Sequence, residues 1–251
     1  MTDPVPAGAN PRRKSGPQNR QKNRLGCGIL IAPLIVVAGL GALGSKAWTP
    51  SQARFPVQGV DVSHHQGAID WAQLPGQGVD FAYIKATEGG DFTDDAFAEN
   101  WRAAQAAGIK RGAYHFFTLC RPGAEQAAHF IATVPADQDA LAPAVDLEFL
   151  GNCADRPKMA DVRAELAAFL TPVEAHYGKP AVLYLTGEFD KTYGISGAFD
   201  RPLWLRSLVF EPGFGARPWT IWQASNFRRL EGVTGRVDWN VMRSGEIPAA
   251  Q

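Results

Sequence analysis

The chain contains 251 residues, in which 25 Lys and Arg residues balance 25 Asp and Glu residues. A content of 45% hydrophobic and 20% charged residues excludes a collagen-like, coiled-coil or wholly disordered chain, and three Cys are too few for a disulfide-dense scaffold. The balance conceals an asymmetry, because residues 1–24 carry a net charge of +5 and the rest of the chain carries −5. The basic and the acidic part therefore need separate explanations.

The N-terminal segment predicts export from the cytoplasm. Residues 1–24 have few apolar side chains, which predicts a disordered basic tail. Residues 25–44 form a run of 20 residues without a charge, about 30 Å long as a helix and enough to cross a bilayer. The basic flank predicts a cytoplasmic tail, with the following residues outside. The run is either a retained transmembrane anchor or a cleaved signal peptide, since 42–44 and 45–47 are small-x-small sites. A linker is expected over 45–56.

Residues 57–246 are expected to form one globular domain, in which β-type runs alternate with helical patterns. Helices are predicted from Asp94 or Asp95 to Gly108, from near Pro122, and over 160–177. Strands are predicted at 59–63, 81–87, 111–117, 144–149, 180–186, 203–207, 220–224 and 236–242. The early alternation indicates parallel strands with right-handed crossovers, whereas the last three strands have little helix between them. The fold class is therefore α/β, an irregular TIM-like barrel with its chemistry at the carboxyl ends of the strands.

The peptide Pro-Ala-Val-Asp-Leu-Glu-Phe over 143–149 is the most informative one. Alternation on a strand puts its large apolar side chains on one face and Asp146 and Glu148 on the other, with their Cα atoms about 6.6–7 Å apart. Two carboxyl groups in a low-dielectric site repel each other, so that one pKa rises and the other stays low. A general acid and an anionic partner need this arrangement for glycoside cleavage.

Further acids and aromatic side chains lie on the same predicted strands. Asp61 and Asp238 lie on the first and last strand, which are neighbours in a closed barrel, so both acids are expected in the same cleft. Aromatic rings stack on the apolar faces of sugars. The residues expected to bind sugar are Tyr114, Tyr184, Trp204 and Trp222, together with the polar residues Lys85, Glu88 and His115 at strand ends.

These motifs together resemble glycoside hydrolase family 25, the Chalaropsis-type lysozymes. The resemblance covers about residues 57–243 and rests on GVDVSHHQG (59–67), IDW (69–71), FAYIKATEG (81–89), GAYHFF (112–117), DLE (146–148), LW (203–204), WQ (222–223) and VDWN (237–240). It implies a (β/α)5(β)3 barrel and cleavage of the β-1,4 bond between N-acetylmuramic acid and N-acetylglucosamine in peptidoglycan. No cofactor is implied.

The resemblance also implies roles for single residues. Glu148 matches the general acid, and Asp146 matches its partner carboxylate, which acts as nucleophile or orients the 2-acetamido group of the substrate. Asp61 and Asp238 match the other acids of the cleft, and Tyr114 matches a site tyrosine. Net retention is expected by either route. The chain departs from the family at His65, where an aromatic residue is frequent, and at 206–208 (Arg-Ser-Leu), where a tyrosine is frequent.

Other functions are compatible with parts of the pattern. A non-catalytic module that binds cell-wall glycan on the same barrel is the alternative, although such a module need not keep all four acids. The histidines at 64, 65 and 115 could join the acids in a metal site, but no His-x3-His helix pair supports one, and no metal is expected. The basic run fits membrane orientation better than nucleic acid. A monomer is expected.

Cys120 and Cys153 each follow a predicted strand by a few residues, and the two strands are successive. Their loops should be neighbours. In an oxidising compartment we therefore expect a disulfide between them at the rim of the cleft.

Overall fold

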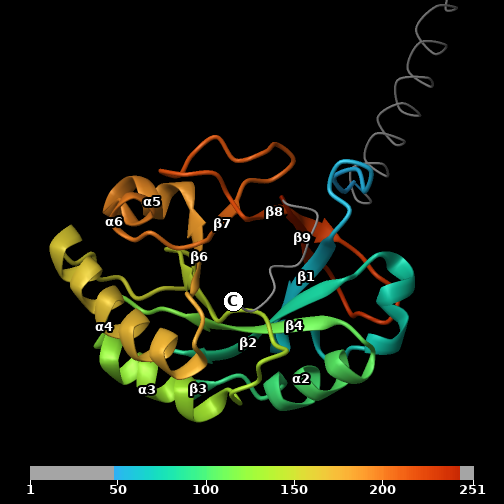
Figure 1. The fold of residues 1–251 in the computed structure, drawn as a ribbon, viewed down its shortest axis with the longest axis horizontal. Coiled ribbons are helices and arrows are strands. Elements are labelled where there is room, and N and C mark those ends of the chain that lie inside the picture. The colour runs from blue at the N-terminus through green and yellow to red at the C-terminus, as the bar shows by residue number, and fades with distance from the viewer. Residues whose placement is uncertain (1–47, 244–251) are drawn as a thin grey trace, which may run out of the picture. The chain divides into compact units, whose positions relative to one another are not determined.

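The computed structural model describes residues 48–243, which form a closed barrel (Figure 1). Its strands are β1 (Gln58–Val62), β2 (Phe81–Glu88), β4 (Lys110–Phe116), β5 (Ala144–Leu147), β6 (Val182–Thr186), β7 (Leu203–Arg206), β8 (Ile221–Arg228) and β9 (Val237–Met242). They follow one another in the order β1-β9-β8-β7-β6-β5-β4-β2, and pairing of β1 with β2 closes the ring. The short strand β3 (Phe92–Thr93) pairs with the end of β2. The predicted α/β barrel is confirmed.

Strand direction decides which ends meet at the mouth of the barrel. The strands β1, β2, β4, β5, β6, β7 and β8 are parallel to one another, whereas β9 is antiparallel to both β8 and β1. The beginning of β9 therefore lies beside the end of β1. This inversion brings Asp238, near the start of its strand, to the end of the barrel where the parallel strands finish.

Helices cover one side of the barrel (Figure 1). The elements are α2 (Phe97–Ala106), α3 (Gly123–Thr133), α4 (Met159–Tyr177), α5 (Gly187–Tyr193) and α6 (Ile195–Ala198), with short 3-10 turns η1 (His64–Gln66), η2 (Trp71–Gln73) and η3 (Pro75–Gln77). The three predicted helices match α2, α3 and α4. The short α5 and α6 were not predicted, because local capping sets them: the Thr186 side chain caps the start of α5, and Gly194, in a left-handed conformation, ends it.

Alternation along the strands separates two apolar clusters. The larger cluster lies between the strands and their outer covering and contains side chains such as Ile84 of β2 and Leu147 of β5. The smaller cluster contains Tyr83 and Trp204 and fills the barrel interior. α2 packs on β2 and β4, and α3 packs on β2 and α4. A side chain therefore points either into the barrel or into the outer core, according to its place in the alternation.

Residues 48–56 cover the side of the barrel that has no helix. Phe55 is buried, and its ring lies 5.8 Å from that of Trp219 and 5.9 Å from that of Trp222. The Gln58 side chain donates hydrogen bonds to the carbonyl oxygens of Pro50 and Phe55, at 3.0 and 2.9 Å. Residues 48–56, where the prediction places a linker, contain no helix or strand, and the aromatic side chains of Trp48 and Phe55 pack on the outer core.

The predicted cytoplasmic tail (1–24) and the apolar run (25–44) lie outside the described residues. Among the helices of residues 48–243, none is both long enough and apolar enough to cross a membrane.

Candidate active site

Four carboxyl groups meet in a cavity at the mouth of the barrel. β5 carries Asp146, and Glu148 follows directly after it. Asp61 of β1 and Asp238 of β9 are direct cross-strand partners, which the antiparallel direction of β9 makes possible. The residues that line the cavity are Asp61, Tyr114, Asp146, Glu148, Tyr184, Trp204, Gln223 and Asp238.

Amide side chains from β9 and β8 hold Asp61. Asn240 Nδ2 and Gln223 Nε2 donate to Asp61 Oδ2 at 2.7 and 3.1 Å. The indole nitrogen of Trp204 donates to Asn240 Oδ1 at 2.8 Å, and the Tyr184 hydroxyl donates to Gln223 Oε1 at 2.9 Å. An indole N–H is only a donor, so it fixes the oxygen of Asn240 toward Trp204 and leaves the NH2 group for the carboxylate.

Burial raises the pKa values of the acids in this cavity. It raises the pKa of Asp61 to about 6, against the hydrogen bonds from Asn240 and Gln223, which lower it. Burial and the negative charge of Asp61 raise the pKa of Asp238 to about 8. The cluster thus favours neutral carboxyl groups at a pH where exposed acids are ionised.

The pKa values of the central pair, Asp146 and Glu148, are raised as well. Burial, then the charge of Glu148, raises the pKa of Asp146 well above its ordinary value. Burial also raises the pKa of Glu148, while the positive charge of Arg206 lowers it. Asp146 Oδ1 is buried and has no hydrogen-bond partner within the protein. The pair thus provides a carboxyl group that can hold a proton and, beside it, a buried oxygen with an unused acceptor position.

Two residues predicted to bind sugar lie on the opposite face of their strands. His115 is completely buried, stacks on Phe169 with ring centroids 4.8 Å apart, and makes hydrogen-bonding contacts with Thr87 and Gln126. Trp222 packs in the outer core, with its indole N–H on the carbonyl oxygen of Ser207. Both predictions are wrong, because each residue directly neighbours one that points inward, and alternation turns it out of the barrel.

The other predicted residues lie at or beside the cavity. Tyr114, Tyr184 and Trp204 line it. Lys85 and Glu88 instead form an ion pair with 2.6 Å between Nζ and Oε2, and the ammonium group lies over the rings of Phe92 and Phe116. This pair is beside the cavity rather than in its wall, although the charge of Lys85 reaches Asp146 and lowers its pKa.

Three residues of the site were not predicted as site residues. Gln223 belongs to the WQ motif and Asn240 to the VDWN motif. Strand alternation places Asn240 on the same face as Asp238, and Gln223 on the face opposite to Trp222. This alternation was the available signal for both amides. Arg206 ends β7, and its Nη1 lies 3.7 Å from Glu148 Oε2. The available signal for Arg206 was that residues 206–208 read Arg-Ser-Leu where a tyrosine is frequent in the family.

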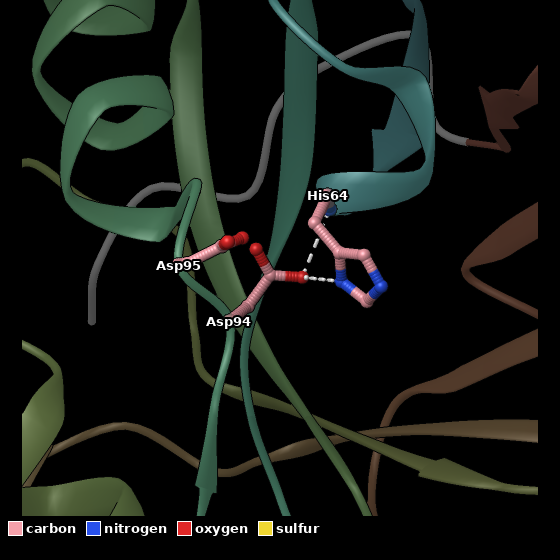
Figure 2. Close-up of side chains that lie close together, drawn as sticks. All are labelled: His64, Asp94 and Asp95. Carbon is pink, nitrogen blue, oxygen red and sulfur yellow. Dashed lines mark hydrogen bonds and ion pairs between the residues drawn. The ribbon is translucent and has the colours of Figure 1, made fainter.

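His64, just after β1, contacts Asp94 in the turn before α2. Figure 2 shows His64 beside Asp94 and Asp95, whose ligand-type atoms lie within 4.8 Å of one another. Asp94 Oδ2 lies 2.8 Å from His64 Nδ1 and accepts from the His64 backbone N–H at 2.9 Å, while Oδ1 accepts from the N–H of Ala96. Asp94 therefore ties the loop after β1 to the turn that starts α2. From the sequence, His64 and His115 were considered as parts of one metal site. In the structure His64 contacts Asp94, whereas His115 contacts Thr87 and Gln126.

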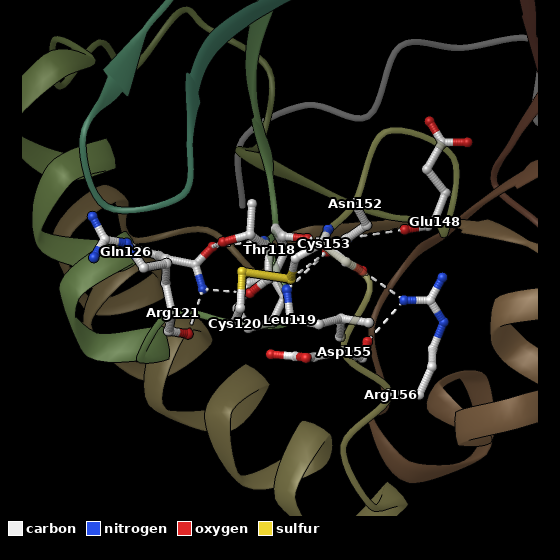
Figure 3. The surroundings of a disulfide bond; sticks show 11 residues. Thr118, Leu119, Cys120, Arg121, Gln126, Glu148, Asn152, Cys153, Asp155 and Arg156 are labelled. Atoms are coloured by element: carbon white, nitrogen blue, oxygen red, sulfur yellow. Dashed lines mark hydrogen bonds between the residues drawn. A yellow bond between two sulfur atoms is a disulfide. The ribbon is translucent and has the colours of Figure 1, made fainter.

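A disulfide joins the loops that follow β4 and β5. Cys120 and Cys153 are bonded, with their Cα atoms 6.3 Å apart (Figure 3). Next to it, Asn152 Nδ2 donates to the carbonyl oxygens of Phe117 and Glu148 at 2.8 and 3.0 Å. The disulfide and Asn152 thus fasten the backbone of Glu148 to the end of β4.

The barrel and its carboxyl cluster define a glycoside hydrolase, and the comparisons with known proteins agree. A sequence profile described as glycosyl hydrolases family 25 matches residues 60–233. The chain belongs to this family.

Among curated proteins, the chain is 36% identical over 218 residues to lysozyme M1 of Streptomyces globisporus, covering 80% of this chain and 73% of the relative. It is 32% identical over 205 residues to the N,O-diacetylmuramidase of Chalaropsis sp., covering 72% and 96%. Among solved structures, a family 25 glycosyl hydrolase from Bacillus anthracis matches with a TM-score of 0.71 and 40% identity, covering 75% of this chain and 89% of the other. The bacterial lysozyme of Streptomyces coelicolor matches with a TM-score of 0.67 and 33% identity, covering 74% and 91%.

Proposed function

We propose that the barrel hydrolyses the β-1,4 bond between N-acetylmuramic acid and N-acetylglucosamine in peptidoglycan, with net retention. The observation that carries this proposal is the pair Asp146 and Glu148 in the wall of one cavity, where burial raises the pKa of Glu148, the proposed general acid. The relatives named lysozyme and N,O-diacetylmuramidase support the choice of substrate.

Glu148 is proposed as the general acid and base. Its carboxyl is largely buried, and burial raises its pKa, which keeps the proton available for the leaving oxygen. After the sugar leaves, the ionised Glu148 removes a proton from the attacking water. The hydrogen bond from Asn152 to the Glu148 carbonyl oxygen holds the backbone in place for both steps.

Asp146 is proposed as the partner carboxylate, either as nucleophile or as the group that orients the 2-acetamido substituent. Its unpartnered Oδ1 suits both routes, because it can attack the anomeric carbon or accept the acetamido N–H. The two routes give different intermediates. A 2-fluoro glycoside that leaves a covalent adduct on Asp146, identified by mass spectrometry, supports direct attack, whereas tight binding of a thiazoline analogue without an adduct supports the substrate-assisted route.

The decisive experiment is the Glu148→Gln variant. We expect it to lose activity on purified cell walls by about 10²- to 10⁴-fold, as for loss of a general acid, with an unchanged melting temperature. Glu99→Gln, an exposed change on α2, is the matched control and is expected to keep full activity. Mass spectrometry of the released fragments identifies the bond cut, and proton NMR of the first anomer tests retention. An equally active Glu148→Gln variant contradicts the proposed role.

We further propose that the barrel acts outside the cytoplasm, anchored through residues 25–44 or released by cleavage after them. The 20 uncharged residues and the +5 flank support export with the tail inside. The bond between Cys120 and Cys153 supports an oxidising compartment. Gel mobility of the exported form separates the two cases, because loss of about 40 residues indicates a cleaved signal rather than an anchor.

A further inference from the structure

Arg206 lies at the mouth of the barrel and is not among the residues predicted to take part in the reaction. It ends β7 two residues after Trp204, so alternation turns it to the same inner face. Its register partners are Thr186 on β6 and Gln223 on β8. The Gln223 side chain donates a hydrogen bond to Asp61. The side chain is 28% exposed, and Nη1 lies 3.7 Å from Glu148 Oε2.

This distance describes an ion pair that is longer than a direct hydrogen bond. The guanidinium is thus close enough to act by its charge while its donors remain available for a closer contact. Lys85, the other cation whose charge reaches the cluster, is 2.6 Å from Glu88 and lies over two aromatic rings. Among the ion pairs of residues 48–243, only that of Arg206 joins a cation to one of the four cavity acids.

We propose that Arg206 is a positioning residue of the active site, which holds the Glu148 carboxyl by its charge and sets the pH range in which the carboxyl cluster works. This inference rests on the proposed function, because it assigns Arg206 to the general acid of that reaction. The groups whose charges or hydroxyls face this cluster from the other strands are Asp61, Lys85, Tyr114, Asp146, Tyr184 and Asp238.

The direction of the effect follows from the sign of the charge. A nearby cation favours ionised carboxyl groups, and Arg206 lowers the pKa values of Asp61, Glu148 and Asp238 against burial. Without Arg206, these pKa values rise. The protonated form of Glu148 limits activity on the alkaline side, so this limb of the pH profile moves to higher pH.

The test compares Arg206→Gln with Arg206→Lys. We expect the alkaline midpoint of the kcat/KM profile on solubilised cell-wall glycan to rise by about one pH unit in Arg206→Gln. It should move by less than half as much in Arg206→Lys, which keeps the charge. Arg102→Gln, an exposed cation on α2, is the control and should leave this midpoint unchanged. A lower rate at an unchanged midpoint would show a merely structural role and overturn the proposal.

A second measurement does not depend on activity. Carbon-13 NMR of labelled glutamate carboxyls follows the titration of Glu148 directly, with the signal assigned by its loss in Glu148→Gln. The Glu148 midpoint should rise in Arg206→Gln and not in Arg102→Gln. Superimposed titrations of wild type and Arg206→Gln, or equal shifts in the Gln and Lys variants, overturn the inference. Arg206→Met replaces Arg206→Gln if that variant does not fold. If wild type releases no sugar but the Glu148 titration shifts as expected, the proposed function fails and the placement of Arg206 stands.

Discussion

The buried acids of the cavity are expected to lower the stability of the fold at neutral pH, and Asp61 allows this to be measured. Burial raises the pKa of Asp61 from 3.8 to about 6, so the folded protein retains a proton that the unfolded chain releases. The favourable contribution is therefore complete below pH 3.8 and is lost as the pH rises through about 6. The carboxyl group destabilises the fold above that pH.

The Asp61→Asn variant removes this ionisation with little change of shape. The new amide oxygen can accept from Asn240 and Gln223, as Asp61 Oδ2 does, and the new NH2 group can donate to Asp238. A rise from 3.8 to about 6 spans about two pKa units, or about 3 kcal/mol of unfolding free energy. For a domain of this size, that is an increase in melting temperature of about 6–12 °C at pH 8.

Calorimetric melting of the protein at pH 8 and pH 4 measures the effect. The gain of Asp61→Asn should be large at pH 8 and small at pH 4, where the wild-type carboxyl is protonated in the folded protein and partly protonated in the unfolded chain. Asp155→Asn, a change of an exposed loop carboxyl, should alter neither value. An equal gain at both pH values, or a loss at pH 8, would refute the link between burial of Asp61 and stability.

Three further changes test the outer core and the loops. Phe55→Ala should lower the unfolding free energy by about 3–5 kcal/mol, as measured by urea denaturation, because the ring is buried against two indoles; an unchanged midpoint would contradict a contribution of this ring to the core. His115→Leu should lower stability by about 1–3 kcal/mol, since it leaves the buried Thr87 hydroxyl without its partner, but should leave the pH profile in place; a shifted profile would put His115 back in the site. Replacing Cys120 and Cys153 together by Ser should lower stability by about 2–4 kcal/mol, and equal melting of both proteins would exclude a stabilising disulfide.

Most of the barrel could be predicted because its strands are short, apolar and bounded by turn residues. The pairing of Asp146 with Glu148 also followed from sequence, since two residues at i and i+2 share a face wherever the strand lies. The hydrogen bonds on Asp61 could not be predicted in this way. They come from residues 162 and 179 positions away, and only the order of the strands brings these together.

The wrong predictions have physical causes of their own. His115 was placed in the site together with its neighbour Tyr114, although two consecutive residues of a strand cannot share a face. The same rule separates Trp222 from Gln223, and it is Gln223 that reaches the cavity. The Pro and Ser content of residues 48–56 predicts a linker, and the aromatic residues Trp48 and Phe55 are the signal for the packing of this segment on the outer core.

The way in which the acids are held has a consequence for the reaction. Asp61 is oriented by two neutral amides, so its position is fixed while its charge is not. A cation in the place of either amide would lower the pKa of Asp61 more strongly and would favour its ionised form. Neutral donors instead hold Asp61 in place while burial keeps its pKa at about 6, and the charge of Arg206 at the mouth acts on Asp61, Glu148 and Asp238 against burial.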